Sequence, residues 1–281
     1  HDDEPAVGEV KYDPAKQTKV PRIDTGVPPA NHTLRLGGET SSYDYVDARH
    51  FVVRGPNYLK DKKKQPSKPS AFELVEVSGF SSTEKTRFTT ERTDSYYSRA
   101  RASGRKNFIF VMHFDLNPMH TVMTYEMNPK ALEEDPAFAK TFKRWLEGDD
   151  AYKNRRIKLI TSVVDANWVV RKTIGKPVPA LIGNKLTCYY RQTEDMIECT
   201  CDVNSSVAAA AILTVVKGAC KGIVCDLVLL IESQEEDELP ERIIGGTRYI
   251  HHDLSGYLVV QPEATCRREE EERKAKEAGK S

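Results

Sequence analysis

Apolar side chains gather in short runs between about residues 51 and 260, whereas both ends of the chain are polar. Runs of strand length that alternate, or that are continuously apolar and rich in β-branched and aromatic residues, are typical of β-strands. The predicted strands are 51–58, 71–79, 107–114, 121–127, 186–190, 196–203, 223–232 and 242–251. The segments 186–190 and 196–203 are expected to form a hairpin. A core rich in sheet follows from this pattern.

Three segments show helical spacing instead. In 135–146 the apolar positions recur every three or four residues, and Pro136 stands in the first turn, where its missing N–H costs little. The segment 157–174 carries an apolar stripe that predicts an amphipathic helix, or a short strand leading into one. An alanine-rich helix is expected over 206–219. We expect Trp168 to be buried on a helix face against the sheet, in core packing or, as the sharper alternative, lining a ligand cavity.

The polar ends divide the chain into three parts. Residues 1–44 are rich in proline and glycine and predict an extended or disordered arm. The folded domain is expected over 45–262, and 263–281 reads as a charged tail. Since the chain begins with His1, we expect a processed or trimmed protein, for which a removed targeting peptide leaves no trace.

Charge and hydropathy narrow the classes of function. Lys plus Arg and Asp plus Glu both number 42, so no global field favours nucleic acid, and we expect no nucleic-acid partner. The apolar run 211–231 is long enough to span a bilayer but contains Lys217, Lys221 and Asp226. Each such charge costs about 2.5–3.5 kcal/mol at the bilayer centre. A buried helix followed by a buried strand fits the run better.

Sequence motifs of catalysis or metal binding are absent: no GxGxxG, GxxxxGK[ST], HExxH or GxSxG occurs. Cys199-Thr200-Cys201 lacks a second ligand pair at zinc spacing. We expect reduced, buried thiols, with Cys199 and Cys201 pointing to opposite faces of a strand. We therefore predict no catalytic residue, no metal and no cofactor. A hydrolase that uses a Cys or His remains a third hypothesis.

Two basic features suggest contact with anionic groups. Five lysines lie in the segment 60–68, which predicts either a solvated loop or a weak contact with anionic membranes. Arg54 stands in a predicted strand, and its planar fork suits a carboxylate or a phosphate. Its candidate carboxylate partners in the chain are Asp149, Asp150 and Asp226. The lysines are Lys60, Lys62, Lys63, Lys64 and Lys68.

Three ordered blocks resemble a known family. Most positions of 51–64 fit the pattern F-x-V-R-G-x-x-Y-L-x-D-x-x-K, and 149–175 fit a block of the form D-x-x-Y-[RK]-x-x-R-[FI]-K-[LV]-I-P followed by a tryptophan, with Thr161 in place of the proline. The stretch 239–247 matches the end of the pattern. Together these blocks resemble the C-terminal domain of the plant Enhanced Disease Resistance 2 proteins, over about residues 45–260.

The resemblance implies a fold and a function. It implies an α+β fold in which a curved antiparallel β-sheet packs on long helices, a helix-grip architecture similar to that of START domains. It also implies a non-enzymatic module that binds or transfers lipid at a membrane surface, with the ligand contacted by Arg54, Tyr58, Lys158 and Trp168. Plant members carry a pleckstrin-homology module and a START domain upstream, and neither is expected in this chain.

The partners expected on this basis are a lipid ligand and an anionic membrane surface. The alternative is an interaction or scaffold subunit of a larger membrane-associated complex, bound through the N-terminal arm. A peripheral membrane or cytoplasmic location is expected, or an organelle after N-terminal processing.

Overall fold

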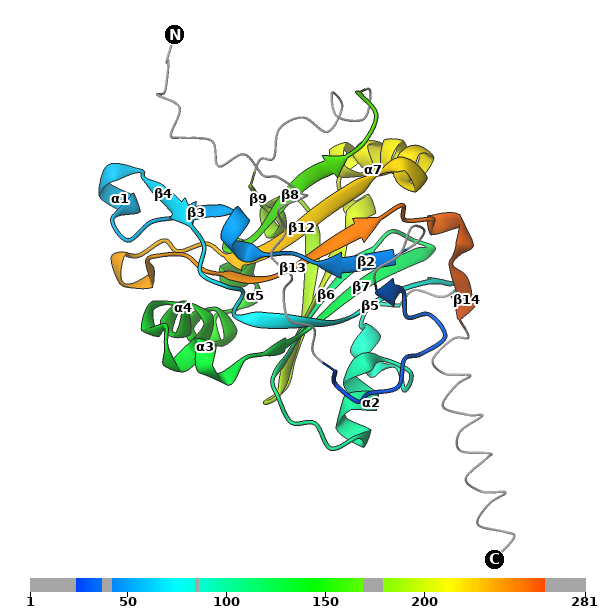
Figure 1. The fold of residues 1–281 in the computed structure, drawn as a ribbon, viewed down its shortest axis with the longest axis horizontal. Coiled ribbons are helices and arrows are strands. Elements are labelled where there is room, and N and C mark those ends of the chain that lie inside the picture. Colours follow the sequence, from blue (N-terminus) through cyan, green and yellow to red (C-terminus); the bar gives the residue numbers. More distant parts are fainter. Residues whose placement is uncertain (1–23, 37–41, 84–85, 169–178, 261–281) are drawn as a thin grey trace, which may run out of the picture.

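A computed structural model describes residues 24–36, 42–83, 86–168 and 179–260 of the 281-residue chain. The fold is α+β and contains two six-stranded sheets and one short two-stranded sheet (Figure 1). Helices lie at the ends and on the outside of the sheets. No helix in these described ranges is long and apolar enough to cross a membrane.

Sheet 1 contains the last long strands of the chain at its centre. Its parallel pair, β1 with β2, lies at one edge, and its other pairs are antiparallel. In spatial order its strands are β1 (Arg35–Leu36), β2 (Ser42–Tyr45), β13 (Ile243–Ile250), β12 (Val224–Ile231), β8 (Ile157–Asp165) and β9 (Ala180–Leu181).

Sheet 2 is also mixed, because β11 runs parallel to β6 and β14 runs parallel to β5. Its remaining pairs are antiparallel. In spatial order its strands are β10 (Thr187–Gln192), β11 (Met196–Asp202), β6 (Ile109–Asp115), β7 (Met119–Met127), β5 (Phe72–Ser82) and β14 (Leu258–Val260).

The remaining elements are short. The two-stranded sheet pairs β3 (Val52–Arg54) with β4 (Lys64–Pro66). The helices are α1 (Tyr58–Asp61), α2 (Tyr96–Ala102), α3 (Pro129–Glu133), α4 (Pro136–Glu147), α5 (Asp150–Asn154) and α7 (Val207–Ala219). Helix α4 begins where the sequence predicts it: the Asp135 carboxylate accepts a hydrogen bond from the Phe138 N–H, and Pro136 follows the cap.

The main hydrophobic core lies between the two large sheets. Tyr125 of β7 is fully buried, and its hydroxyl lies 2.7 Å from the Thr247 hydroxyl on β13. Gly245 of β13 lies against the Tyr125 ring so closely that a Cβ at this position would come within 2.5 Å of it. The absence of a side chain at Gly245 therefore lets the two sheets approach here.

The outer faces of the sheets are also covered. Helix α2 contributes Tyr96 and Ala100 to a cluster on the outer face of sheet 2. Val53 of β3 and Phe51, which directly precedes this strand, pack with Ile160 and other residues on the outer face of sheet 1. These two layers bury both sheets on both sides over much of their area, as continuously apolar strands require.

Most predicted strands occur within a few residues of their expected bounds, and the α+β class is confirmed. Two expectations were wrong in detail. The segment 51–58 is a strand only at Val52–Arg54, and there are two mixed sheets rather than one antiparallel sheet. For 157–174, the second of the two predicted alternatives begins as expected, with a strand over Ile157–Asp165, and 169–178 lie outside the described residues. The longest helix among the described residues is α7, with 13 residues, so long packing helices are not found there.

Candidate functional site

An apolar cavity lies where helix α7 meets the two large sheets, with a volume of about 320 Å³. Its walls contain no Asp, Glu, Lys or Arg among the described residues. The lining residues are Phe114, Leu116, Thr121, Leu159, Thr161, Val163, Leu186, Val203, Ala209, Ile212, Leu213, Val216, Cys220, Ile223, Cys225, Leu227, Tyr249, His252 and Leu254. A cavity of this size and lining is typical of sites for small apolar ligands.

Small residues in α7 explain why this space is not filled. The helix begins at Ser206, whose hydroxyl accepts a hydrogen bond from the Ala209 N–H, and continues through four consecutive alanines. Alanine favours the helix but has too small a side chain to occupy the gap between helix and sheets. Leu213 of α7 is buried, and Ile212 lines the cavity while remaining 51% exposed. The cavity mouth therefore lies beside Ile212.

Thr121 and His252 of the cavity wall belong to a small neutral cluster with Tyr257, which is not itself a lining residue. The Tyr257 hydroxyl contacts both the Thr121 hydroxyl, at 2.9 Å, and His252 Nε2. Burial lowers the pKa of His252 to about 4, so the imidazole is neutral at physiological pH. Among the described residues, neither the Tyr249 hydroxyl nor His252 Nδ1 has a hydrogen-bond partner, although both side chains are at least nine-tenths buried.

Three of the four predicted ligand contacts come together at a different place. Arg54, Tyr58 and Lys158 line a second cavity of about 230 Å³ beside β3 and β8. Both cations are already neutralised. Arg54 lies 3.0 Å from Glu232, and Lys158 lies 2.6 Å from Glu241 and 3.1 Å from Glu232.

This arrangement identifies the role of Arg54. Its guanidinium lies 4.8 Å from the centre of the Tyr58 ring, and it donates a hydrogen bond to the Ser233 carbonyl at 2.7 Å. The prediction that its partner would be Asp149, Asp150 or Asp226 was wrong. Asp149 caps α5, and Asp226 forms a two-point pair with Arg248. The missed signal was the pair Glu232, the last residue of the predicted strand 223–232, and Glu241, nine residues later in the sequence.

The fourth predicted contact, Trp168, is 74% exposed, so the expectation of a buried tryptophan was wrong. It lies three residues beyond the end of β8, and the residues that follow it, 169–178, lie outside the described ranges. The buried tryptophan is Trp145 of α4, which is fully enclosed and packs against Phe110 and Phe142.

The lysine-rich segment is folded rather than an open loop. It runs from α1 into β4, and its αL residue is Lys62, with φ of 57°. Lys60 pairs with Glu236 at 3.0 Å, and Lys68 pairs with the buried carboxylate of Asp135 at 2.9 Å. The membrane contact predicted for this segment stays a prediction, with two of its five charges already paired.

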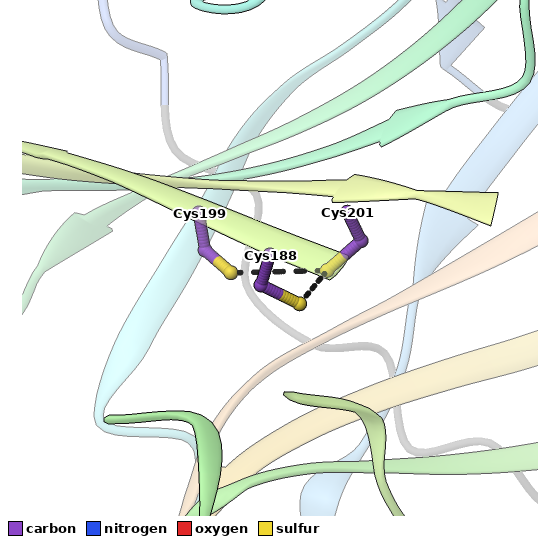
Figure 2. A group of neighbouring side chains, drawn as sticks. All are labelled: Cys188, Cys199 and Cys201. Atoms are coloured by element: carbon purple, nitrogen blue, oxygen red, sulfur yellow. Dashed lines mark hydrogen bonds between the residues drawn. The ribbon is translucent and has the colours of Figure 1, made fainter. Parts of the chain in front are cut away.

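Three buried thiols point toward one another on sheet 2 (Figure 2). Cys188 of β10 stands directly opposite Cys201 of β11, with their Sγ atoms 3.1 Å apart, and Cys199 Sγ lies 3.8 Å from Cys201 Sγ. The expectation that Cys199 and Cys201 would face opposite ways was wrong, because residues two apart on a strand share a face. The neighbouring Leu186 and Val203 line the apolar cavity.

The thiols can satisfy one another without a metal. Hydrogen bonds from Cys199 and Cys201 lower the pKa of the Cys188 thiol to about 5. Burial raises the pKa of Cys199, and the neighbouring Cys188 raises that of Cys201, so both remain protonated donors. Three soft sulfur ligands would suit Cu(I) or zinc, and no other group of at least three His, Cys, Asp or Glu side chains within the described ranges converges in this way.

A second buried network of hydrogen-bonded side chains lies on the outer side of sheet 2. His113 Nδ1 lies 3.1 Å from the Thr200 hydroxyl, and its Nε2 lies 2.9 Å from His120 Nδ1. Glu198 is fully buried, and both of its oxygens accept hydrogen bonds from Thr89 and Thr90. These groups hold the segment around residue 90 against the sheet.

Comparisons with known proteins agree with the sequence blocks. A family described as "Protein ENHANCED DISEASE RESISTANCE 2, C-terminal" matches residues 43–253. The chain is 27% identical over 248 residues to a protein of Arabidopsis thaliana named "Protein ENHANCED DISEASE RESISTANCE 2-like". The aligned region covers 87% of this chain and 34% of that protein. The chain therefore spans about a third of the relative's length. No solved structure matches significantly.

Proposed function

This chain belongs to the Enhanced Disease Resistance 2 C-terminal family, and we propose that it is a non-enzymatic module that binds a lipid in the cavity beneath α7. The observation that carries the proposal is the cavity itself: about 320 Å³, enclosed by two sheets and a helix, with no charged group in its described wall. Empty apolar space destabilises a protein, since its lining loses packing contacts. A hydrocarbon chain would restore those contacts.

The outer face of α7 supports action at a membrane surface. A helix on the surface of a water-soluble domain normally has a polar outer side. In α7 the exposed residues include Val207, which is 91% exposed, and Ile212 at the cavity mouth. The stretch 203–225 contains Lys217 and Lys221 and no acidic residue. We therefore propose that α7 contacts an anionic bilayer, so that a lipid tail can enter the cavity without crossing water.

Trp168 lies at the same end of sheet 1 as the C-terminal end of α7. Asp165, at the end of β8, pairs with Val224, which follows α7 by a single 3-10 turn, Cys220–Gly222. Exposed tryptophan is enriched where proteins meet the membrane interface. The predicted role of Trp168 as a ligand contact is thus replaced by a proposed role at the membrane.

Of the helix-grip architecture that the resemblance implies, the proposal keeps one feature only: a ligand held between a sheet and a helix. The scaffold alternative depends on the arm at 1–44, of which 1–23 and 37–41 lie outside the described residues, and no contact of the described part favours it. A hydrolase would need a nucleophile and a base in a cleft. The lipid-binding function rests on fewer assumptions.

Binding is tested with a fluorescent long-chain acyl probe that brightens in apolar surroundings. We expect saturable binding to the wild type, and weakened binding to Leu227→Trp, which places a larger ring in the cavity. The matched control is Val259→Trp, at a 70% exposed position on β14. Equal binding by the wild type and Leu227→Trp, or no binding to the wild type, would overturn the proposal.

Membrane contact is tested by sedimentation with phosphatidylcholine vesicles that contain or lack phosphatidylserine. Val207→Asp should lower the affinity about tenfold or more, because a charge in the apolar region is costly. Val259→Asp adds the same charge elsewhere and should bind as the wild type. If instead only the variant with Lys60, Lys62, Lys63, Lys64 and Lys68 changed to Gln loses binding, the lysine segment is the contact and the role of α7 is refuted.

A further inference from the structure

Three thiols meet on the inner face of sheet 2, on the neighbouring strands β10 and β11. Cys188 stands directly opposite Cys201, and Cys199 lies two residues before Cys201, so the three side chains share one face. The Cys201 Sγ lies 3.1 Å from that of Cys188 and 3.8 Å from that of Cys199. All three Sγ atoms lie within 4.8 Å of one another, and Figure 2 shows them around one small space.

The spacing of the sulfurs fits a single metal ion with little rearrangement. With metal–sulfur bonds of about 2.3 Å, three sulfurs around one ion lie about 4.0 Å apart. Cys199 and Cys201 are already near this separation. Cys188 has to move away from Cys201 by roughly 1 Å to reach it. Since β10 is the edge strand of sheet 2, this movement displaces no further strand of the sheet.

The number and kind of ligands favour Cu(I) over zinc. Structural zinc sites are closed by four protein ligands, and no fourth Cys, His, Asp or Glu among the described residues joins the three thiols. Cu(I) is a soft ion that prefers sulfur and is satisfied by three ligands. Met112 of β6 stands beside Cys199 in register and belongs to the same core cluster as the thiols, so the nearest strand adds a thioether rather than a harder oxygen ligand.

A buried cation next to the cluster suits the charge of such a site. Lys153 is only 6% exposed and forms no ion pair with a described residue; its ammonium donates to the Gly148 carbonyl. The ammonium lies 5.9 Å from the centre of the Tyr190 ring, and Tyr190 stands directly opposite Cys199. Metal binding replaces thiol protons and leaves three thiolates around one monovalent ion, which is a net negative group. Lys153 places a positive charge one aromatic ring away from it.

We propose that Cys188, Cys199 and Cys201 bind one Cu(I) ion through three sulfur ligands. The ion does not need a path through the lipid cavity, because metal binding is coupled to folding and the edge strand β10 brings one ligand to two others on β11. Leu186 and Val203, two residues from Cys188 and Cys201, line the cavity, so the ion would fix this part of its wall. The inference goes beyond lipid binding and does not depend on it.

The experiment titrates the full chain, reduced and kept free of oxygen, with Cu(I) in competition with the coloured chelator bicinchoninate. We expect the wild type to take one equivalent of copper from the chelator. X-ray absorption at the copper edge should then show three sulfur neighbours at about 2.3 Å. Cys201→Ser removes the central sulfur and should weaken copper binding by more than about a hundredfold, since even the outer partners of metal ligands account for about 10- to 100-fold.

The matched controls are Cys225→Ser and Cys266→Ser, each of which removes one thiol outside the cluster. Both should hold copper as the wild type does. Copper should also raise the melting temperature of the wild type but not that of Cys201→Ser. If Cys201→Ser does not fold, the absorption spectrum of the wild type decides the question. Wild-type protein that takes no copper, a copper shell with fewer than three sulfurs, or loss of copper in either control would overturn the site.

Discussion

At the residue scale, the exposure of the two tryptophans determines how much each side chain contributes to the stability of the fold. Trp145 is fully buried, and its indole N–H donates to the Lys153 carbonyl at 3.3 Å, whereas Trp168 is 74% exposed. Truncation of a buried tryptophan costs about 3–5 kcal/mol. We expect Trp145→Ala to lower the free energy of unfolding by this amount in a denaturant titration, and Trp168→Ala to leave it nearly unchanged. Similar values for the two variants would contradict this placement.

The charges around Arg54 form a buried network in which each member depends on the others. Lys158 neutralises Glu232 and Glu241, and Lys158→Met would leave two carboxylates with Arg54 alone. Breaking a buried pair by removing one partner costs about 3–5 kcal/mol. The control is Lys60→Met, whose pair with Glu236 is exposed and is worth about 0–1 kcal/mol. Equal melting temperatures of the two variants would show that the network contributes little.

The buried histidines predict how stability depends on pH. Burial lowers the pKa of His113 well below its usual range and also lowers that of His120. Between pH 7 and 5 the unfolded chain therefore binds protons that the folded chain does not, so stability falls as the pH falls through about 6.5. Each histidine contributes at most about 1.4 kcal/mol per pH unit.

The measurement is the free energy of unfolding at a series of pH values for the wild type and His113→Gln. We expect the variant to be less stable at pH 7 but to lose less stability between pH 7 and 5. A wild type whose stability rises as the pH falls over this range would contradict the assignment of neutral buried imidazoles.

At the element scale, two glycines in regular elements have opposite roles. Gly245 of β13 faces the Tyr125 ring, whereas a Cβ at Gly218 of α7 meets nothing within 4 Å. Gly245→Ala should destabilise the protein by about 1–3 kcal/mol through overpacking. Gly218→Ala should stabilise it by about 0.5–1 kcal/mol, since alanine favours a helix interior. Thermal unfolding of both variants checks the signs, and a neutral Gly245→Ala would argue against the close approach of the sheets.

The extent to which elements could be predicted follows from their periodicity. The helix at 135–146 and the continuous apolar strands were found because their patterns are unambiguous. For the segment 157–165 the sequence left both a helix and a strand open, because an apolar strand with inward residues on both faces also matches a helical stripe, and β8 is covered on both faces. The predicted hairpin is confirmed as the antiparallel pair β10 and β11. Pairings between distant segments were not predictable, because contacts such as β11 with β6 join residues about 87 positions apart.

In the candidate site, too, contacts between residues far apart in the sequence could not be predicted. Arg54, Tyr58 and Lys158, which the family resemblance singled out, line one cavity. Arg54 and Lys158 pair there with Glu232 and Glu241, and the ligand contact predicted for the three residues stays a prediction. The lining of the cavity could not be foreseen, because its residues come from five strands, helix α7 and several turns, and individually they look like core residues. Only the small residues at 208–211 of α7 hinted at unfilled space.

At the scale of the whole molecule, the ends of the two sheets and α7 enclose apolar space that an ordinary core would fill. Val207 and Ile212 of the same helix are exposed, and Lys217 lies near its C-terminal end. Both observations are accounted for if the cavity receives a hydrocarbon chain from a membrane.

The most direct test of this claim is native mass spectrometry of the full chain purified from cells without detergent. We expect a fraction of the protein to carry one additional mass that organic extraction identifies as a lipid, and this mass should be lost in Leu227→Trp. The control Val259→Trp should retain it. Wild-type protein that carries no lipid, and takes up none after incubation with vesicles, would contradict the account.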